Sequence, residues 1–299
     1  MVNSLTSTST IMAWCGTGRP EMDIESVSLT ERLLRRDYWL VLGGMVAITL
    51  LSWAYILSGA RTGMSVWGMT FVSLFPHRMA ATMGDMAMQP AMWSPGYWII
   101  MLLMWWVMMI AMMMPSAAPV ILLYARATRH AQAKGQLEQG AVPTSAFAGG
   151  YLMSWLAFSL LASTLQWRLE RSGGISCMLM VSTKARISAT ILVFAGMYQL
   201  SPWKQMCLRH CRAPAEFLSR HWRPGAWGGL RMGLEHGAFC VGCCWMLMAL
   251  LFVGGIMNVL WIAVLAIFVL LEKVASYGSW LARATGIVLL AWGVATLAV

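Results

Sequence analysis

The chain has 299 residues, of which 59% are hydrophobic and 11% are charged, and its formal net charge is +10. Soluble proteins usually carry about a quarter charged residues, so this composition excludes an ordinary soluble domain and indicates a polytopic membrane protein. The positive charge does not favour nucleic-acid binding, because the basic residues lie in short segments between apolar runs, where they act as determinants of membrane topology.

Seven apolar segments approach or exceed the roughly 20 helical residues that cross a bilayer. They cover residues 38–57, 97–124, 146–167, 187–203, 230–253, 256–271 and 281–299. We therefore predict an all-α membrane protein with about seven transmembrane helices. Lysine and arginine are more frequent in the connections that lie on the side of the N-terminus, so we expect the N-terminus inside and the C-terminus outside.

The distribution of polar residues divides the chain into an N-terminal tail and one transmembrane domain. Residues 1–36 are rich in Ser and Thr and lack the pattern of a cleaved signal peptide, so we expect a mobile cytoplasmic tail. Residues 37–299 are predicted to form a single transmembrane domain. Its two longest connections are an external loop at 59–96 and a basic cytoplasmic loop at 204–227.

The external loop is rich in methionine, and its central residues are Met83, Met86 and Met88. Thioethers bind soft metals and persist where thiols would be oxidised, so this spacing favours a site that collects cuprous copper. The alternative is an amphipathic segment that packs at the membrane surface against Trp93 and Trp98.

Four methionines form one stripe of the segment 97–124: Met101, Met104, Met108 and Met112. Methionine often fills cores, so the stripe indicates either packing or a row of thioether ligands, and Met113 points away from it. Pro115 and Pro119 follow, and each leaves the carbonyl four residues earlier without its usual donor. A bend near the bilayer centre is therefore expected.

The cytoplasmic loop contains Cys207 and Cys211, four residues apart. This is not a zinc-finger spacing. The two thiols are secondary candidates for metal binding or transfer, and the alternative is that they are inert thiols in a reducing compartment.

The strongest signal lies in the segment 230–253, where His236, Cys240 and Cys243 fall within a helical arc of roughly 60°, with Cys244 about 40° beyond it. Imidazole and thiolate bind zinc, whereas thiolate with thioether selects cuprous copper. A single cysteine could simply pack between helices, but a histidine in a bilayer is costly and marks function. Glu235 is a secondary candidate that could orient the imidazole. We expect this face to meet the methionine stripe of the segment 97–124, at Met108 or Met112.

Two segments resemble the signatures of a bacterial family described as predicted metal-binding integral membrane proteins. They read Met-Met-Met-Pro-Ser-Ala-Ala-Pro at 112–119 and Gly-Leu-Glu-His-Gly-Ala-Phe-Cys-Val-Gly-Cys-Cys-Trp-Met-Leu-Met at 233–248, and the later Gly-Gly-Ile-Met-Asn at 254–258 and Glu-Lys at 272–273 agree. The resemblance implies a multi-pass metal-binding protein of the bacterial inner membrane. It implies no particular substrate.

These observations predict a protein that binds or moves a soft metal ion, with cuprous copper favoured and zinc as the alternative. The expected partners are the metal ion, the lipid bilayer and a metal donor, a metal acceptor or a membrane enzyme complex, with no nucleic acid. One alternative is a membrane thiol-disulfide oxidoreductase that uses Cys240, Cys243 and Cys244. Another is a structural subunit of a membrane complex. A binding protein is favoured over an enzyme, because adjacent cysteines form a strained disulfide within a helix.

Overall fold

The computed structural model describes residues 24–60, 66–73, 75, 93–133, 135, 142–176, 180–275 and 277–298. This part of the chain contains helices and no β-strands, which confirms the predicted all-α fold. The helices are α1 (Ile24–Leu57), α2 (Val66–Met69), α4 (Pro95–Ala133), α5 (Val142–Arg171), α6 (Ala185–Leu200), α7 (Pro202–Arg212), α8 (Pro214–His221), α9 (Gly225–Ala249), α10 (Leu251–Gly254), α11 (Val259–Val274) and α12 (Gly278–Ala298).

Helices form most of each of the seven predicted apolar segments. Within the described residues, five are long and apolar enough to cross a membrane: Tyr38–Leu57, Pro95–Gln132, Thr144–Arg171, Gly225–Gly254 and Gly278–Ala298. Helices α6 and α11 have 16 residues each, which at about 1.5 Å per residue is shorter than a typical hydrocarbon core of roughly 30 Å. The count of seven spans and the orientation therefore stay predictions.

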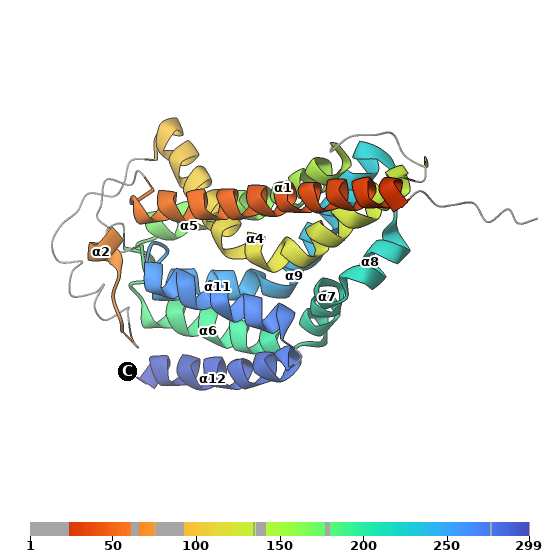
Figure 1. Cartoon of the computed structure of the whole chain (residues 1–299). Coiled ribbons are helices and arrows are strands. Elements are labelled where there is room, and N and C mark those ends of the chain that lie inside the picture. The colour runs from red at the N-terminus through yellow and green to blue at the C-terminus, as the bar shows by residue number, and fades with distance from the viewer. Residues whose placement is uncertain are drawn as a thin grey trace, which may run out of the picture.

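The bundle has two groups of helices that lie against each other (Figure 1). One group contains α1, α4, α5 and α9, and the other contains α6, α11 and α12. Close backbone contact joins α5 to α9, since a Cβ added to Gly150 would lie 2.1 Å from the carbonyl oxygen of Leu230, and one added to Gly233 would lie 2.0 Å from that of Phe147. Small residues allow such contacts between membrane helices.

Helix α4 occupies the centre of the bundle and continues past Pro115 and Pro119. The methionines of its predicted stripe are 0–1% exposed, and Met113 and Met114, on other faces, are also buried. Between Met108 and Met114 every residue of α4 is buried, and a segment that is buried on all faces is typical of a core helix. Beside the prolines, Ser116 Oγ and Tyr151 Oη donate hydrogen bonds to the carbonyl oxygen of Met113, at 2.8 and 3.2 Å.

The segment 204–227, expected as a basic loop, folds into α7 and α8. Each helix has a proline, Pro202 or Pro214, at its first turn, where the missing N–H costs nothing. The Ser201 side chain accepts a hydrogen bond from the backbone N–H of Lys204 and so caps α7. Helix α7 packs against α9, and this contact carries its cysteines into the bundle.

Candidate metal site

Four sulfur atoms from three helices form two close pairs in the interior. The Cys211 Sγ of α7 lies 3.9 Å from the Cys243 Sγ of α9, and the Cys244 Sγ of α9 lies 3.9 Å from the Met113 Sδ of α4. Two sulfurs that share a metal ion at about 2.3 Å each lie roughly 3.8 Å apart in tetrahedral geometry. Each pair therefore has the spacing of two ligands to one ion.

The cysteines of α9 do not all point to one centre. The thiols of Cys243 and Cys244 donate to the carbonyl oxygen of Cys240, at 3.1 and 2.9 Å. Among the described residues, no group of three or more His, Cys, Asp or Glu side chains is placed to hold a metal ion. The arrangement thus offers sulfur pairs supplied by different helices, with methionine as one of the ligands.

Cys240 contacts a buried cation. The Lys273 Nζ of α11 lies 2.9 Å from Cys240 Sγ and 3.1 Å from Ser116 Oγ, and the Tyr151 Oη lies 3.2 Å from the same sulfur. Lys273 is 6% exposed, and it forms no ion pair with a carboxylate in the part of the chain that the structure describes. The Cys240 sulfur is therefore the group placed to compensate this charge.

A second buried charge pair lies next to the first along α11. Lys204 Nζ is 2.6 Å from Glu272 Oε1, and both side chains are at most 1% exposed. Gln199 is hydrogen-bonded to both partners. A Glu-Lys pair at the end of a membrane helix usually anchors it at the surface. Here Glu272 contacts Lys204 of α7 and Gln199 of α6, and Lys273 contacts Cys240 of α9, so both side chains of the pair point into the bundle.

His236 lies one helical turn before Cys240 and is 3% exposed. Its ring is surrounded by aromatic rings, with centroid distances of 5.2 Å to Phe217, 6.1 Å to Tyr151 and 6.3 Å to Phe147. Its Nδ1 has no hydrogen-bond partner among the described residues. Because a buried polar atom without a partner costs free energy, this nitrogen is available for a ligand.

The carboxylate of Glu235 pairs with arginines rather than with the imidazole of His236. Its carboxylate lies 3.5 Å from Arg223 and 3.4 Å from Arg231, and it forms no hydrogen bond with His236. In the structure the Glu235 carboxylate thus pairs with arginines, and its expected role at the imidazole stays a prediction without a supporting contact.

The methionine stripe is buried as predicted, but its predicted contact is not the one observed. The methionine sulfur of α4 that lies within hydrogen-bonding distance of an α9 thiol belongs to Met113, not to Met108 or Met112. At the far end of the stripe, Gln166 Nε2 lies 3.8 Å from Met101 Sδ. Met83, Met86 and Met88 lie outside the described residues.

The two cysteines of α7 have different surroundings. Cys211 contacts Cys243, whereas Cys207 lies beside Gly242, where an added Cβ would be 3.0 Å from its sulfur. Hydrogen bonding to Cys240 and Cys243, and then burial, raises the pKa of the Cys211 thiol well above its usual value. Burial raises the pKa of Cys207 as well.

The ligands predicted from the sequence did not include Met113, Tyr151, Ser116 or Lys273, although Met113, Ser116 and Lys273 lie in the segments that carry the family resemblance. A second signal for Lys273 is its place in an apolar helix, because ionisable residues within membrane segments usually have a function. Nothing local distinguishes Met113 from the six other methionines between Met101 and Met114.

The fold and the site define a class: an all-helical protein whose described part contains five helices long and apolar enough to cross a membrane, with paired sulfur side chains between its helices. The sequence pattern of a copper chaperone family, PpoB2, matches residues 102–296. The chain belongs to this copper chaperone family. No curated protein and no solved structure matches the chain. The matched range contains both sulfur pairs and Lys273.

Proposed function

We propose that this protein binds cuprous copper between helices α4, α7 and α9 and delivers it to a protein partner. The observation that carries the proposal is the meeting of Cys211 with Cys243 and of Cys244 with Met113 in the buried interior. Thiolate and thioether ligands together select cuprous copper among the biological metals. Membership of a copper chaperone family supports the same metal.

The charges around Cys244 and Met113 also favour a monovalent ion. With the Cys240 thiolate compensating the Lys273 ammonium, the Cys244 thiolate and the neutral Met113 thioether form a neutral site with cuprous copper. Zinc with the same groups would leave a net positive charge in an apolar interior, which is costly. Binding releases the protons of the thiols that become ligands.

The route of copper into the site is part of the proposal. The buried stripe of methionines in α4 ends one residue before Met113, and thioethers exchange a soft ion without changing charge. We assign the external Met83, Met86 and Met88 to collection of copper and the stripe to its passage. We place the protein in the bacterial inner membrane, where the acceptor is a membrane enzyme complex or a soluble carrier.

The test is copper binding by the detergent-purified protein under reducing conditions, in competition with a chromogenic chelator of cuprous copper. We expect stoichiometric binding by the natural protein and loss of that binding in Cys243→Ser. The matched control is Cys207→Ser, which removes a cysteine one turn from Cys211 whose sulfur lies beside Gly242 and forms no hydrogen-bonded sulfur pair with the described residues. Circular dichroism verifies that each variant keeps its helices. Equal binding by all three proteins, or binding by none, contradicts the proposal.

A thiol-disulfide oxidoreductase is the second candidate, and one observation favours it. Cys211 and Cys243 approach each other from different helices, and all cysteines of the described part are free thiols. Oxidation of this pair would need a two-electron acceptor. Turnover of a quinone or of a dithiol substrate by the copper-free protein, lost in Cys211→Ser, would favour this activity over copper delivery.

A further inference from the structure

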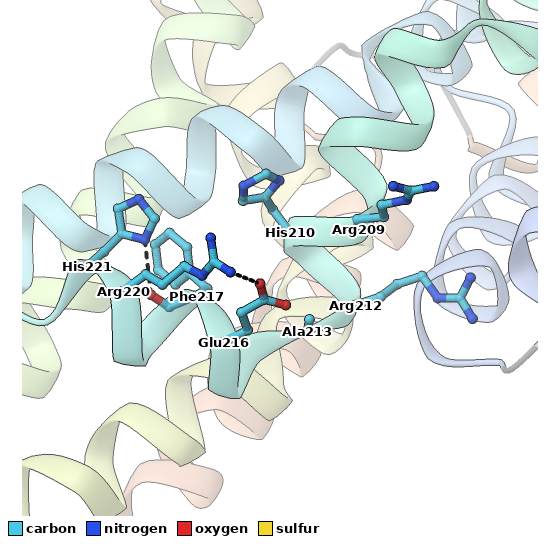
Figure 2. A pocket seen from close by; sticks show the side chains of 8 residues that line it. All are labelled: Arg209, His210, Arg212, Ala213, Glu216, Phe217, Arg220 and His221. Carbon is cyan, nitrogen blue, oxygen red and sulfur yellow. Dashed lines mark hydrogen bonds and ion pairs between the residues drawn. The ribbon is translucent and has the colours of Figure 1, made fainter.

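Helices α7 and α8 enclose a pocket of about 550 Å³ that the copper site does not use (Figure 2). This volume lies in the range of small-molecule sites. Five of the side chains that line it are basic: Arg209, His210, Arg212, Arg220 and His221.

The arginines give the pocket a positive charge. Its one acidic lining residue, Glu216, pairs with Arg220 at 2.9 Å, so three arginines and one glutamate leave a formal charge of +2 with neutral histidines. Arg212 donates to the carbonyl oxygen of Ala275 at 2.7 Å, which fixes its guanidinium at the end of α11. Guanidinium groups bind carboxylate and phosphate groups in a two-point geometry.

The two histidines are held in fixed orientations. His210 Nδ1 lies 3.0 Å from the carbonyl oxygen of Met206, and His221 Nδ1 lies 3.1 Å from that of Phe217. Because a carbonyl oxygen only accepts, Nδ1 carries a proton in each ring, and Nε2 donates to an anion when the ring is an imidazolium. The His210 ring also stacks on Phe239, with centroids 4.3 Å apart. Side chains that are already ordered lose little entropy when a ligand binds.

The pocket adjoins the proposed copper site. Phe217 lines the pocket, and its ring centroid is 5.2 Å from that of His236. Cys211 follows His210 in α7 and contacts Cys243 in the interior. Two lining residues, Phe217 and His210, are therefore direct neighbours of residues of the candidate metal site.

We propose that this pocket binds a small anion with at least two carboxylate or phosphate groups, and that such an anion, when it also has a thiolate that holds cuprous copper, brings the ion to Cys211. The proposal of an anion site depends only on the geometry of α7 and α8. Its role as the copper carrier rests on the proposed function.

The anion site is tested with citrate, titrated calorimetrically into metal-free protein in a neutral detergent. We expect saturable binding that weakens about tenfold or more in Arg209→Gln, because a hydrogen bond to a charged group is lost. The matched control is Arg231→Gln, which removes the same charge from the start of α9 and should leave citrate binding unchanged. Absence of binding, or equal binding by Arg209→Gln and the natural protein, overturns the proposal.

The source of the anion is decided by repeating the titration in nanodiscs. If phosphatidylcholine discs preserve citrate binding and discs with added phosphatidylglycerol abolish it, a lipid headgroup occupies the pocket and the carrier role is overturned. If both discs preserve binding, the ligand is a soluble anion, as proposed.

The carrier role is tested by the rate of copper loading. Arg209→Gln should slow loading from the anionic complex of cuprous copper with glutathione and leave loading from the cationic acetonitrile complex unslowed. Equal rates from both complexes in the variant and the natural protein overturn the carrier role. If the natural protein takes copper from neither complex, the proposed function fails while the citrate result stands.

Discussion

The Lys273 ammonium lies 2.9 Å from the Cys240 sulfur at a depth where both side chains are almost inaccessible to solvent. An uncompensated buried charge is strongly destabilising, and Lys273 has no carboxylate partner in the described part of the chain. The pair is therefore asymmetric. We expect removal of the lysine to lower the free energy of unfolding less than removal of the cysteine does.

This asymmetry predicts a specific double-mutant cycle. Cys240→Ala leaves the ammonium without its partner and should lower the free energy of unfolding by about 3–5 kcal/mol. Lys273→Met replaces a buried charge with an apolar side chain of similar length and should be nearly neutral. In the Lys273→Met background, Cys240→Ala should cost clearly less than it does alone, as measured by denaturation of the detergent-solubilised protein. Additive effects would show that the two residues do not interact.

Replacement of Met113 by leucine should weaken cuprous copper binding about tenfold, or roughly 1.4 kcal/mol. The physical reason is the loss of the thioether that lies 3.9 Å from the Cys244 sulfur, at nearly constant side-chain volume. Met109→Leu is the control, since Met109 is equally buried on the same helix. Competition with a copper chelator measures both. If the two variants bind alike, Met113 is a packing residue.

Gly233→Ala should disrupt the packing of α5 on α9, because its Cβ would lie 2.0 Å from the Phe147 carbonyl oxygen. We expect a loss of thermal stability of several degrees together with loss of copper binding, since α9 carries three of the cysteines. Gly149→Ala is the matched control, because nothing lies within 4 Å of the Cβ that it adds. Thermal scanning with an intrinsic fluorescence readout compares them. Equal melting temperatures would contradict the observed backbone contact.

Replacement of Met83, Met86 and Met88 together by leucine should reduce copper loading at low supply and leave zinc binding unchanged. The reason is that thioethers favour cuprous copper and contribute little to zinc sites. Titration of both metals into the purified variant measures the difference. Equal loss of both metals, or loss of neither, would assign these methionines to packing at the membrane surface.

Several features followed from the sequence because they depend on local periodicity. Apolar runs of about 20 residues predict helices in any membrane protein, since each backbone polar group must be satisfied within its own segment. The common face of His236, Cys240 and Cys243 follows from the helical repeat, and all three side chains are buried in the bundle. The burial of the methionine stripe follows in the same way.

The tertiary structure decided which of these faces meet. The contacts between Cys211 and Cys243, between Met113 and Cys244, and between Lys273 and Cys240 join residues that are 32, 131 and 33 positions apart. Such contacts depend on the rotation and approach of whole helices, as Gly150 and Gly233 illustrate where they allow α5 and α9 to touch along their backbones. The helical repeat predicts which side chains share a face, but it holds no information on the neighbour that the face will contact. The sequence alone therefore determined the elements and the ligand types, and the packing of the helices determined the composition of the site.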